Sequence, residues 1–247
     1  MDLTGKVAIV TGGGTGIGKA ISRALAAAGA HVAVNYSRSG TDAATTVREL
    51  EGLGVRATAI RANVSLADEV RLMIERTTDE LGGLDLLVNN AGTTKFVDFK
   101  DLDNMDEEAW DRIMAVNLKG TFLCCKAAAE PMRRAGGGSI VNISSVAGVR
   151  AAGSSIAYAV SKAGVIHLTR CMALALAPDI RVNSVAPGLV LTRWQDHMSA
   201  EERRGRAEAA PLKRTVEPEE IATAAVECLR NDAMTGQTIV VDAGSLL

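Results

Sequence analysis

Short runs of Val, Ile, Leu and Ala alternate along the chain with longer stretches whose apolar residues recur every three or four positions. The short runs lack a regular polar alternation, which is typical of strands covered on both faces in a parallel sheet. They lie at residues 6–12, 31–36, 55–62, 84–92, 139–145, 180–188 and 237–244. Amphipathic helices are predicted at about 16–28, 41–52, 66–81, 106–134, 155–177 and 217–230. The alternation predicts an α/β fold, a doubly wound parallel sheet of about seven strands with helices on both faces.

The connection between the sixth strand and the last helix departs from this rhythm. About 28 residues, 189–216, separate the two elements, and loops of this length in compact domains are usually functional. We expect this lid segment to cover a substrate site. No Pro-, Gly- or Ser-rich linker and no internal repeat divides the chain, so residues 1–247 are predicted to form one domain.

Composition and charge exclude several classes of function. The formal charge is −2 with both signs mixed along the chain, so no nucleic-acid surface is expected. The four cysteines have no zinc or CxxC spacing, and His31, His167 and His197 lack a second ligand at metal spacing, so no metal is expected. The first residues contain no apolar run long enough for a signal peptide or a membrane span. We expect a soluble, cytoplasmic protein.

The end of the first strand carries a cluster of glycines. In open α/β sheets, ligands bind beyond the carboxyl ends of the strands. The first strand ends in TGGGTGIG, directly before a predicted helix. Glycine lets the backbone turn tightly and approach a pyrophosphate at the N-terminus of that helix. The position of the cluster therefore favours a dinucleotide-binding site.

Small or polar residues also follow the later strands. The fourth strand ends in NNAG (89–92), the fifth in NISS, which contains Ser145, and the sixth in APG (186–188). Asn117 lies within a long apolar helical stretch, where a buried amide must satisfy both its donors and its acceptor. Each feature taken alone also fits a purely structural role as a turn, a cap or a buried hydrogen bond.

One of the two tyrosines, Tyr158, precedes Lys162 by four residues in SSIAYAVSKAGVIHL (154–168). On a helix this spacing places the two side chains on one face, one turn apart. An ammonium beside a phenol favours the phenolate and lowers a pKa that is ordinarily about 10, so such a pair could transfer protons near neutral pH. The same spacing also describes an exposed pair on a surface helix, and these residues alone leave both interpretations open.

In this order, TGxxxGxG, NNAG, Asn117, Ser145, YxxxK and PG closely resemble the motifs of the short-chain dehydrogenase/reductase family. The resemblance runs from KVAIVTG to TIVVDAG and covers essentially the whole chain. It implies a single-domain Rossmann-type fold and an enzyme that interconverts a ketone and a secondary alcohol by hydride transfer with a nicotinamide cofactor. Ser145 is preferred over Ser144 because it precedes Tyr158 by thirteen residues, as in the family pattern.

The resemblance implies a catalytic set of Asn117, Ser145, Tyr158 and Lys162. Tyr158 would be the general acid in carbonyl reduction and the base in alcohol oxidation. Lys162 would lower the pKa of Tyr158 and bind the ribose hydroxyls. Ser145 would hold the substrate oxygen, and Asn117 would position a water that connects Lys162 to solvent.

The family pattern also assigns the cofactor contacts. The glycine-rich loop would hold the pyrophosphate, and Asn63, after the third strand, would contact the adenine. Residues 90–92 would contact the ribose of the adenosine, and the backbone near Val190 and the side chain of Thr192 would hold the carboxamide. The cofactor-binding residues implied in this way, besides Tyr158 and Lys162, are Gly12, Thr15, Gly16, Ile17, Gly18, Asn35, Tyr36, Ser37, Arg38, Asn63, Val64, Asn90, Ala91, Gly92, Pro187, Gly188, Val190 and Thr192.

The end of the second strand predicts NADP(H) rather than NAD(H). An acidic residue at this position would bind the 2′-hydroxyl of NAD. Here residues 35–39 are Asn, Tyr, Ser, Arg and Ser, and the first carboxylate is that of Asp42. The Arg38 guanidinium and the serine hydroxyls can donate charge-assisted hydrogen bonds to a 2′-phosphate.

The sequence leaves the small-molecule substrate open. Relatives with these motifs reduce 3-oxoacyl thioesters, sugars or cyclic ketones, but residues 91–105 and VDAG at 241–244 depart from typical 3-oxoacyl-carrier-protein reductases. Trp194, Met198 and Leu191 are candidate apolar walls. The alternatives are a sugar or cyclic-alcohol dehydrogenase and, from another class, a catalytically silent cofactor-binding regulator.

The resemblance also implies a homotetramer. Its interfaces would be formed by the predicted helices at 106–134 and 155–177, whose alanine-rich faces allow helices to approach closely. The same faces would serve packing inside one chain equally well.

Overall fold

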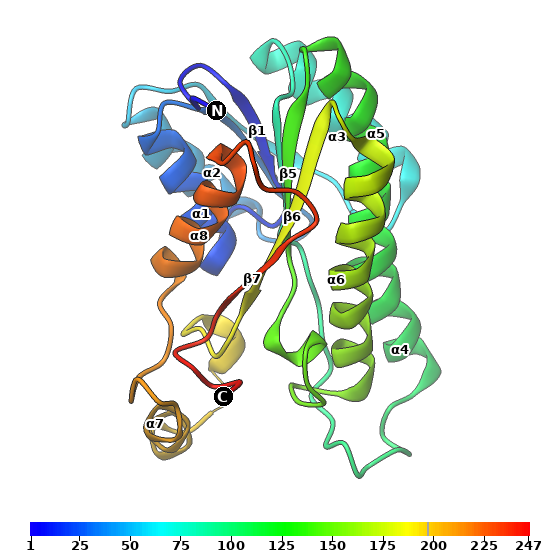
Figure 1. Cartoon of the computed structure of the whole chain (residues 1–247), viewed down its shortest axis with the longest axis vertical. Helices are drawn as coiled ribbons and strands as arrows, with labels where there is room; N and C mark the ends of the chain where they lie inside the picture. Colours follow the sequence, from blue (N-terminus) through cyan, green and yellow to red (C-terminus); the bar gives the residue numbers. More distant parts are fainter. Residues whose placement is uncertain (197) are drawn as a thin grey trace.

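The computed structural model describes every residue except His197, so the expectation for that histidine lies outside the described residues. Seven parallel strands form one sheet in the order β3-β2-β1-β4-β5-β6-β7 (Figure 1). They are β1 (Val7–Val10), β2 (His31–Tyr36), β3 (Ala57–Arg61), β4 (Leu86–Asn89), β5 (Gly138–Ile143), β6 (Ile180–Pro187) and β7 (Thr238–Val241). The predicted fold class and the seven predicted strands are confirmed.

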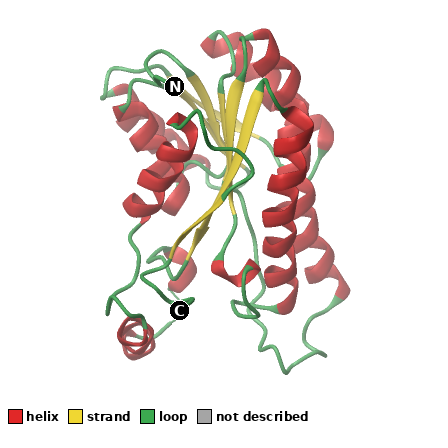
Figure 2. Cartoon of the chain, viewed as in Figure 1, coloured by secondary structure: helices red, strands yellow, loops and turns green. Residues whose placement is uncertain are grey.

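Helices cover both faces of the sheet, as Figure 2 shows with the strands enclosed between two helical layers. One layer contains α1, α2 and α8, and the other contains α3, α4, α5 and α6 (Figure 1). Their bounds are α1 (Gly16–Ala27), α2 (Gly40–Glu51), α3 (Ala67–Leu81), α4 (Glu107–Met114), α5 (Gly120–Arg134), α6 (Ile156–Leu176) and α8 (Pro218–Arg230).

The strands divide the core between the two layers, because successive strand residues point to opposite faces. In β1, Ala8 and Val10 belong to the cluster under α1 and α8, whereas Val7 and Ile9 belong to the cluster under α3, α5 and α6. All four residues of β1 are buried. Such burial on both faces explains why the strands read as continuous apolar runs.

The predicted helix at 106–134 is not continuous. A π-helical segment, Ala115–Lys119, separates α4 from α5, and Asn117 lies in its middle. The apolar periodicity continues through the segment, so the pattern alone predicts one helix. π-Segments inside helices occur mostly at functional sites, which fits the place of Asn117 in the sequence motif.

The lid segment is more regular than its sequence predicts. Its two ends pair through Val190 and Val216, and between them lie a 3-10 turn (Arg193–Gln195) and the helix α7 (Ala200–Ala209). α7 begins with a capping box between Ser199 and Glu202. No residue of α7 is buried, and the helix lies beside the C-terminus, apart from both helical layers (Figure 1).

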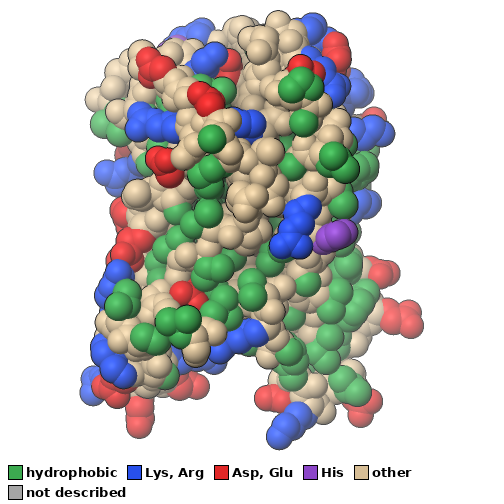
Figure 3. Space-filling view, viewed as in Figure 1, with side chains coloured by type: hydrophobic (Ala, Val, Ile, Leu, Met, Phe, Trp, Pro, Cys, Tyr) green, Lys and Arg blue, Asp and Glu red, His purple; other side chains and the backbone are tan. Residues whose placement is uncertain are grey.

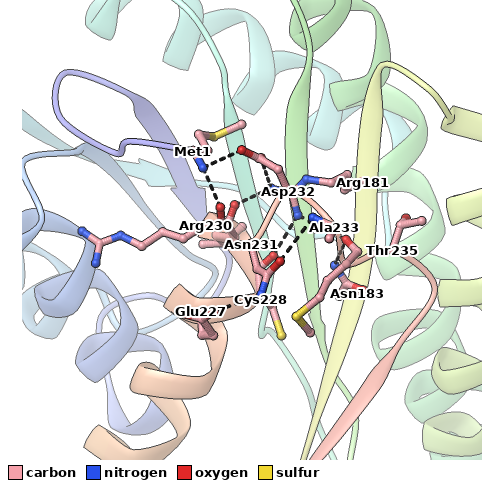
Figure 4. A network of polar contacts seen from close by, with 12 residues as sticks. Met1, Arg181, Asn183, Glu227, Cys228, Arg230, Asn231, Asp232, Ala233 and Thr235 are labelled. Carbon is pink, nitrogen blue, oxygen red and sulfur yellow. Dashed lines mark hydrogen bonds and ion pairs between the residues drawn. The ribbon is translucent and has the colours of Figure 1, made fainter.

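Arg181 of β6 fastens the end of α8 to the sheet (Figure 4). Its guanidinium donates to the carbonyls of Cys228 and Leu229 and lies 3.3 Å from the Asp232 carboxylate. A cation at a helix C-terminus is favoured because the last carbonyls have no partner within the helix. This network lies at the opposite end of β6 from Pro187 and so stabilises the fold away from the strand ends where ligands bind.

Candidate active site

A cavity of about 720 Å³ lies at the carboxyl ends of the strands, where β1 and β4 are neighbours and the strand order reverses. This is the position at which open α/β sheets bind ligands. The cavity is lined by three of the four predicted catalytic residues and by every predicted cofactor-binding residue except Gly18. The two predicted residues that do not line it, Gly18 and Asn117, lie directly behind its wall.

The glycine-rich loop has the conformation that a pyrophosphate cradle requires. Gly12 and Gly16 have φ angles of +62° and +50°, a region that favours glycine. α1 begins at Gly16, and the side chain of Thr15 makes no capping hydrogen bond to it. A Cβ at Gly18 would lie 2.2 Å from the carbonyl oxygen of Gly12. Gly18 therefore lets the loop fold back on α1, and the first N–H groups of that helix remain directed to the cavity.

Two asparagines, Asn35 buried and Asn90 half-buried, hold this loop in place. Asn35 Oδ1 accepts from Gly12 N, and its Nδ2 donates to the carbonyls of Ile60 and Ala62. Asn90 Nδ2 donates to the carbonyls of Thr11 and Gly12. Both residues line the cavity, but their amides are bonded to protein backbone. Their contribution to a cofactor site is the shape of the loop.

The adenosine end of the cavity is formed by the residues after β2 and β3. Tyr36, Ser37, Arg38 and Ser39 line it from one side, and Asn63 and Val64 line it from the other. Asn63 Oδ1 accepts from the backbone N and the hydroxyl of Ser65, which closes a tight turn after β3. No carboxylate of residues 35–39 faces this end, because that stretch contains none.

The predicted catalytic pair, Tyr158 and Lys162, lies at the start of α6. Ser155 caps this helix by accepting from the backbone N of Tyr158, at 3.3 Å. Lys162 Nζ donates to the carbonyl of Ile143 at 2.7 Å and lies 5.7 Å from the centre of the Tyr158 ring. A Cβ at Gly148 would lie 2.5 Å from the backbone of Lys162, so the turn after Ser145 packs directly on α6.

Burial dominates the electrostatics of the pair. Loss of solvent raises the pKa of Tyr158, and a hydrogen bond with Ser145 acts in the opposite direction. Loss of solvent also lowers the pKa of Lys162 to about 8. In this structure the Lys162 ammonium donates to the carbonyl of Ile143, and the expectation that it lowers the pKa of Tyr158 stays a prediction.

Asn117 joins α6 to the loop after β4. Its Oδ1 accepts from Thr93 N at 2.8 Å, and its Nδ2 donates to the Thr93 carbonyl and to Ser161 Oγ, each at 3.0 Å. The Asn117 backbone carbonyl accepts from the Thr121 hydroxyl. All hydrogen bonds given for the Asn117 side chain are thus made to protein groups, and the side chain does not line the cavity.

The cavity also contains residues that the sequence motifs did not identify. Thr93 follows NNAG, and Arg193 and Gln195 flank Trp194 in the lid segment. Of the three predicted apolar walls only Trp194 lines the cavity, because Met198 is buried elsewhere and Leu191 is turned to solvent. Arg193 pairs with Asp42 of α2, at 2.8 Å. The two residues are 151 positions apart in the chain, so no sequence pattern indicated that they form a pair.

The described part of the chain offers no group of three His, Cys, Asp or Glu side chains that could hold a metal ion. Among those residues, α6 is the one helix long and apolar enough to cross a membrane. It carries Tyr158 and Lys162 and packs on the sheet, which is typical of a core helix. Figure 3 shows basic and acidic side chains interspersed on the viewed face, in keeping with the balanced charge of the sequence.

Comparisons with known proteins agree with this geometry. Residues 6–203 match the family model for short chain dehydrogenases. The chain is 41% identical to a 3-oxoacyl-(acyl-carrier-protein) reductase of Synechocystis sp., covering 99% of this chain and 98% of that protein. It is also 41% identical to the corresponding reductase of Staphylococcus aureus, covering 97% of both chains.

Solved structures show the same similarity. The crystal structure of a short-chain type dehydrogenase/reductase from Mycobacterium marinum matches with a TM-score of 0.91 at 38% identity, covering 99% of this chain and 96% of that one. Another from Mycobacterium ulcerans matches with a TM-score of 0.92 at 35% identity, covering 100% of this chain and 91% of that one.

The fold and the site together define an NAD(P)-dependent oxidoreductase that acts on CH–OH and C=O groups. The chain belongs to the short-chain dehydrogenase/reductase family. The residues present fit a nicotinamide dinucleotide, because the glycine-rich loop leaves the space that a Cβ would fill and directs the N-terminus of α1 to the cavity.

Proposed function

We propose that the protein reduces a ketone to a secondary alcohol with NADPH, and that 3-oxoacyl thioesters are its substrate class. The observation that carries the proposal is the convergence of Ser145, Tyr158 and Lys162 on one cavity, with Asn117 behind its wall. A catalytically silent regulator would have no need of this set. The curated relatives named as 3-oxoacyl-(acyl-carrier-protein) reductases support the substrate class.

The proposed mechanism divides the reaction between the cofactor and the chain. A bound nicotinamide would supply the hydride that adds to the carbonyl carbon. The Tyr158 hydroxyl donates its proton to the carbonyl oxygen, and the Ser145 hydroxyl holds that oxygen by a hydrogen bond. Since burial raises the pKa of Tyr158, the protonated form needed for reduction prevails at neutral pH. In the oxidation direction the tyrosinate accepts the proton.

Lys162 and Asn117 would serve the return of the proton. Burial lowers the pKa of Lys162 to about 8, so its ammonium can lose and regain a proton near neutral pH. Asn117 links Thr93, after β4, to Ser161 of α6 by hydrogen bonds. We assign Asn117 a positioning role, through the loop after β4 and the first turns of α6.

The preference for NADP(H) is supported by the charge at the adenosine end. Arg38 lines this end of the cavity, and its guanidinium can bind a 2′-phosphate. Asp42, the nearest carboxylate in the sequence, is paired with Arg193, which neutralises its charge. A 2′-phosphate beside Arg38 would therefore meet a guanidinium in a stretch, residues 35–39, that contains no carboxylate.

The first experiment measures NADPH-dependent reduction of a panel of 3-oxoacyl thioesters, cyclic ketones and sugars by wild type and by Tyr158→Phe. Loss of a positioned acid is expected to lower single-turnover reduction by about 10²–10⁴-fold. NADPH binding, followed by its fluorescence, is expected to change little. Activity of the variant within about tenfold of wild type would end the assignment of Tyr158. The panel also separates a thioester reductase from a sugar or cyclic-alcohol dehydrogenase.

The second experiment tests the cofactor preference with Arg38→Ala. The fall in kcat/KM for NADPH is expected to correspond to a loss of about 1.5–3 kcal/mol of transition-state stabilisation, the range for hydrogen bonds to charged groups. The value of kcat/KM for NADH is expected to change little. Arg48→Ala, on the exposed side of α2, is the matched control because Arg48 does not line the cavity. A wild-type preference for NADH, or equal losses with both cofactors, would contradict the proposal.

A further inference from the structure

Three consecutive residues of the lid segment contact three different sides of the cavity. Thr192 faces the glycine-rich loop, where a Cβ at Gly16 would lie 3.2 Å from Thr192 Cγ2. The Arg193 guanidinium donates two hydrogen bonds to the Asp42 carboxylate, at 2.9 and 2.8 Å. Trp194 contacts the catalytic side. The 3-10 turn therefore extends across the cavity and is held from both ends.

The indole of Trp194 lies directly against Tyr158. The two ring centres are 6.0 Å apart and the ring planes meet at 65°, which is an edge-to-face contact. No substrate atom fits between rings at this separation. The indole also approaches the loop after β4, because a Cβ at Gly92 would lie 3.7 Å from Trp194 Cη2. Trp194 thus closes one side of the space beside Tyr158.

This position restricts the carbonyl compounds that can react. A ketone that presents its oxygen to Tyr158 and Ser145 must direct its two carbon substituents to opposite sides of the reacting carbon. A substituent directed toward Trp194 meets the indole and the Gly92 backbone at once. Only a small group fits there without displacing the lid.

We propose that Trp194 is the specificity-determining residue of the site and limits one substituent of the ketone to about the size of a methyl group. This inference rests on the proposed function and names its substrate class more narrowly. The preferred substrates are methyl ketones, including 3-oxobutanoyl thioesters, and longer or branched 3-oxoacyl chains react more slowly.

The Asp42–Arg193 pair acts as the positioning element for Trp194. Both side chains are accessible to solvent, so the pair adds little to overall stability. Its two parallel hydrogen bonds nevertheless fix the direction of the turn. Trp194 N donates to Thr192 Oγ1 at 3.4 Å, which adds a second constraint on the same turn. Asp42→Asn is therefore expected to loosen the indole without removing it.

The test compares three esters that differ only beyond the reacting carbonyl: ethyl 3-oxobutanoate, ethyl 3-oxohexanoate and ethyl 4-methyl-3-oxopentanoate. With NADPH, wild type is expected to favour the first over the branched ester by about tenfold or more in kcat/KM, the effect of a few methylenes in a closed pocket. Trp194→Ala is expected to bring this ratio near one by gaining activity on the branched ester. Trp194→Phe and Asp42→Asn are expected to give intermediate ratios.

The controls separate specificity from damage. Trp110→Phe removes the other tryptophan, which does not line the cavity, and is expected to leave the ratio unchanged. Circular dichroism and thermal unfolding confirm that each variant is folded, and Trp194→Phe carries the test if Trp194→Ala is not. In Trp110→Phe, the fluorescence emission of Trp194 is expected to change when ethyl 3-hydroxybutanoate is added and not when its branched analogue is added.

Each outcome decides the matter. Equal changes for all three esters in Trp194→Ala, or no discrimination by wild type, would overturn the inference while leaving the proposed function intact. A gain on every ester in Trp194→Ala would show that the indole blocks the site rather than selects. If wild type reduced none of the esters and no other ketone with NADPH, the proposed function would fail and the inference with it.

Discussion

Three asparagine amides, those of Asn35 and Asn117 buried and that of Asn90 half-buried, shape the backbone around the cavity. Asn35 and Asn90 bond the glycine-rich loop, and Asn117 bonds the loop after β4. A buried donor or acceptor that loses its partner costs about 1–3 kcal/mol, so these loops have one favoured conformation. At the residue scale, the site is prepared by side chains that make no direct contact with the reacting atoms.

Lys162 makes the stability of the protein depend on pH. Burial lowers its pKa from 10.5 to about 8 in the folded state. Between these values the unfolded chain holds a proton that the folded chain has released, so the free energy of unfolding rises with pH. Relative to Lys162→Met, the free energy of unfolding of wild type is expected to rise by on the order of 3 kcal/mol between these two pH values. Below pH 8 the difference between the two proteins is expected to stay constant.

Urea unfolding of both proteins without cofactor, at half-unit steps from pH 6.5 to about 10, measures this difference. The comparison with the variant cancels groups that titrate equally in both proteins. A difference that stays constant with pH would show that Lys162 keeps an ordinary pKa, and one that falls above pH 8 would show a raised pKa; either result would contradict the prediction.

At the scale of elements, close backbone contacts position the strands and helices around the site. Gly18 lets α1 approach the loop after β1, and Gly148 lets the turn after β5 approach α6. Gly120 lets α5 approach the turn after β3, since a Cβ there would lie 3.2 Å from the Val64 carbonyl oxygen. These contacts bring groups from three strand ends to one cavity.

Gly18→Ala tests the closest of these contacts. The added methyl would lie 2.2 Å from the Gly12 carbonyl oxygen and 2.5 Å from Asn90 Nδ2, so the loop must shift. We expect NADPH affinity to fall by at least about tenfold, with a loss of stability of about 1–3 kcal/mol. Fluorescence titration and thermal unfolding measure the two effects.

Gly205→Ala is the matched control for this substitution. Gly205 lies in α7, where an added methyl meets nothing within 4 Å. Helix propensity there favours alanine by up to about 1 kcal/mol, so cofactor affinity is expected to stay the same and stability to hold or rise. Equal effects of the two substitutions would contradict the role given to Gly18.

At the scale of the whole molecule, one helical layer carries large apolar side chains on its outer surface. Trp110 of α4, Phe122 of α5, and Val160 and Leu174 of α6 are all exposed, Leu174 by 84%. Exposed apolar groups gathered on adjoining elements are typical of interfaces. They support the proposal that this layer, which the sequence assigned to subunit contacts, joins copies of the chain in a homotetramer.

Light scattering at micromolar concentration is expected to give about four times the chain mass of 25.7 kDa. Leu174→Glu would place a charge in the interface and is expected to shift the protein to smaller species. Leu53→Glu is the control, because Leu53 is also exposed but follows α2 in the other layer. A monomeric wild type, or equal effects of the two substitutions, would refute the tetramer.

The sequence by itself determined the sheet, the order of its elements and the positions of the candidate catalytic residues. Strands buried on both faces must be apolar throughout, so the strands can be recognised in the sequence as continuous apolar runs. Tyr158 and Lys162 lie one turn apart on a single helix, so their spacing can also be recognised in the sequence. The glycines of the first loop were equally visible, because their role depends on adjacent elements.

Only the tertiary structure decided what surrounds those residues. The pairing of Arg193 with Asp42, the contact of Trp194 with Tyr158 and the bonding of Asn117 to Thr93 join residues far apart in the chain. Burial, which lowers the pKa of Lys162 and raises that of Tyr158, depends on all the elements packed around α6. Such effects follow from desolvation and from long-range packing, which no local pattern of residues records.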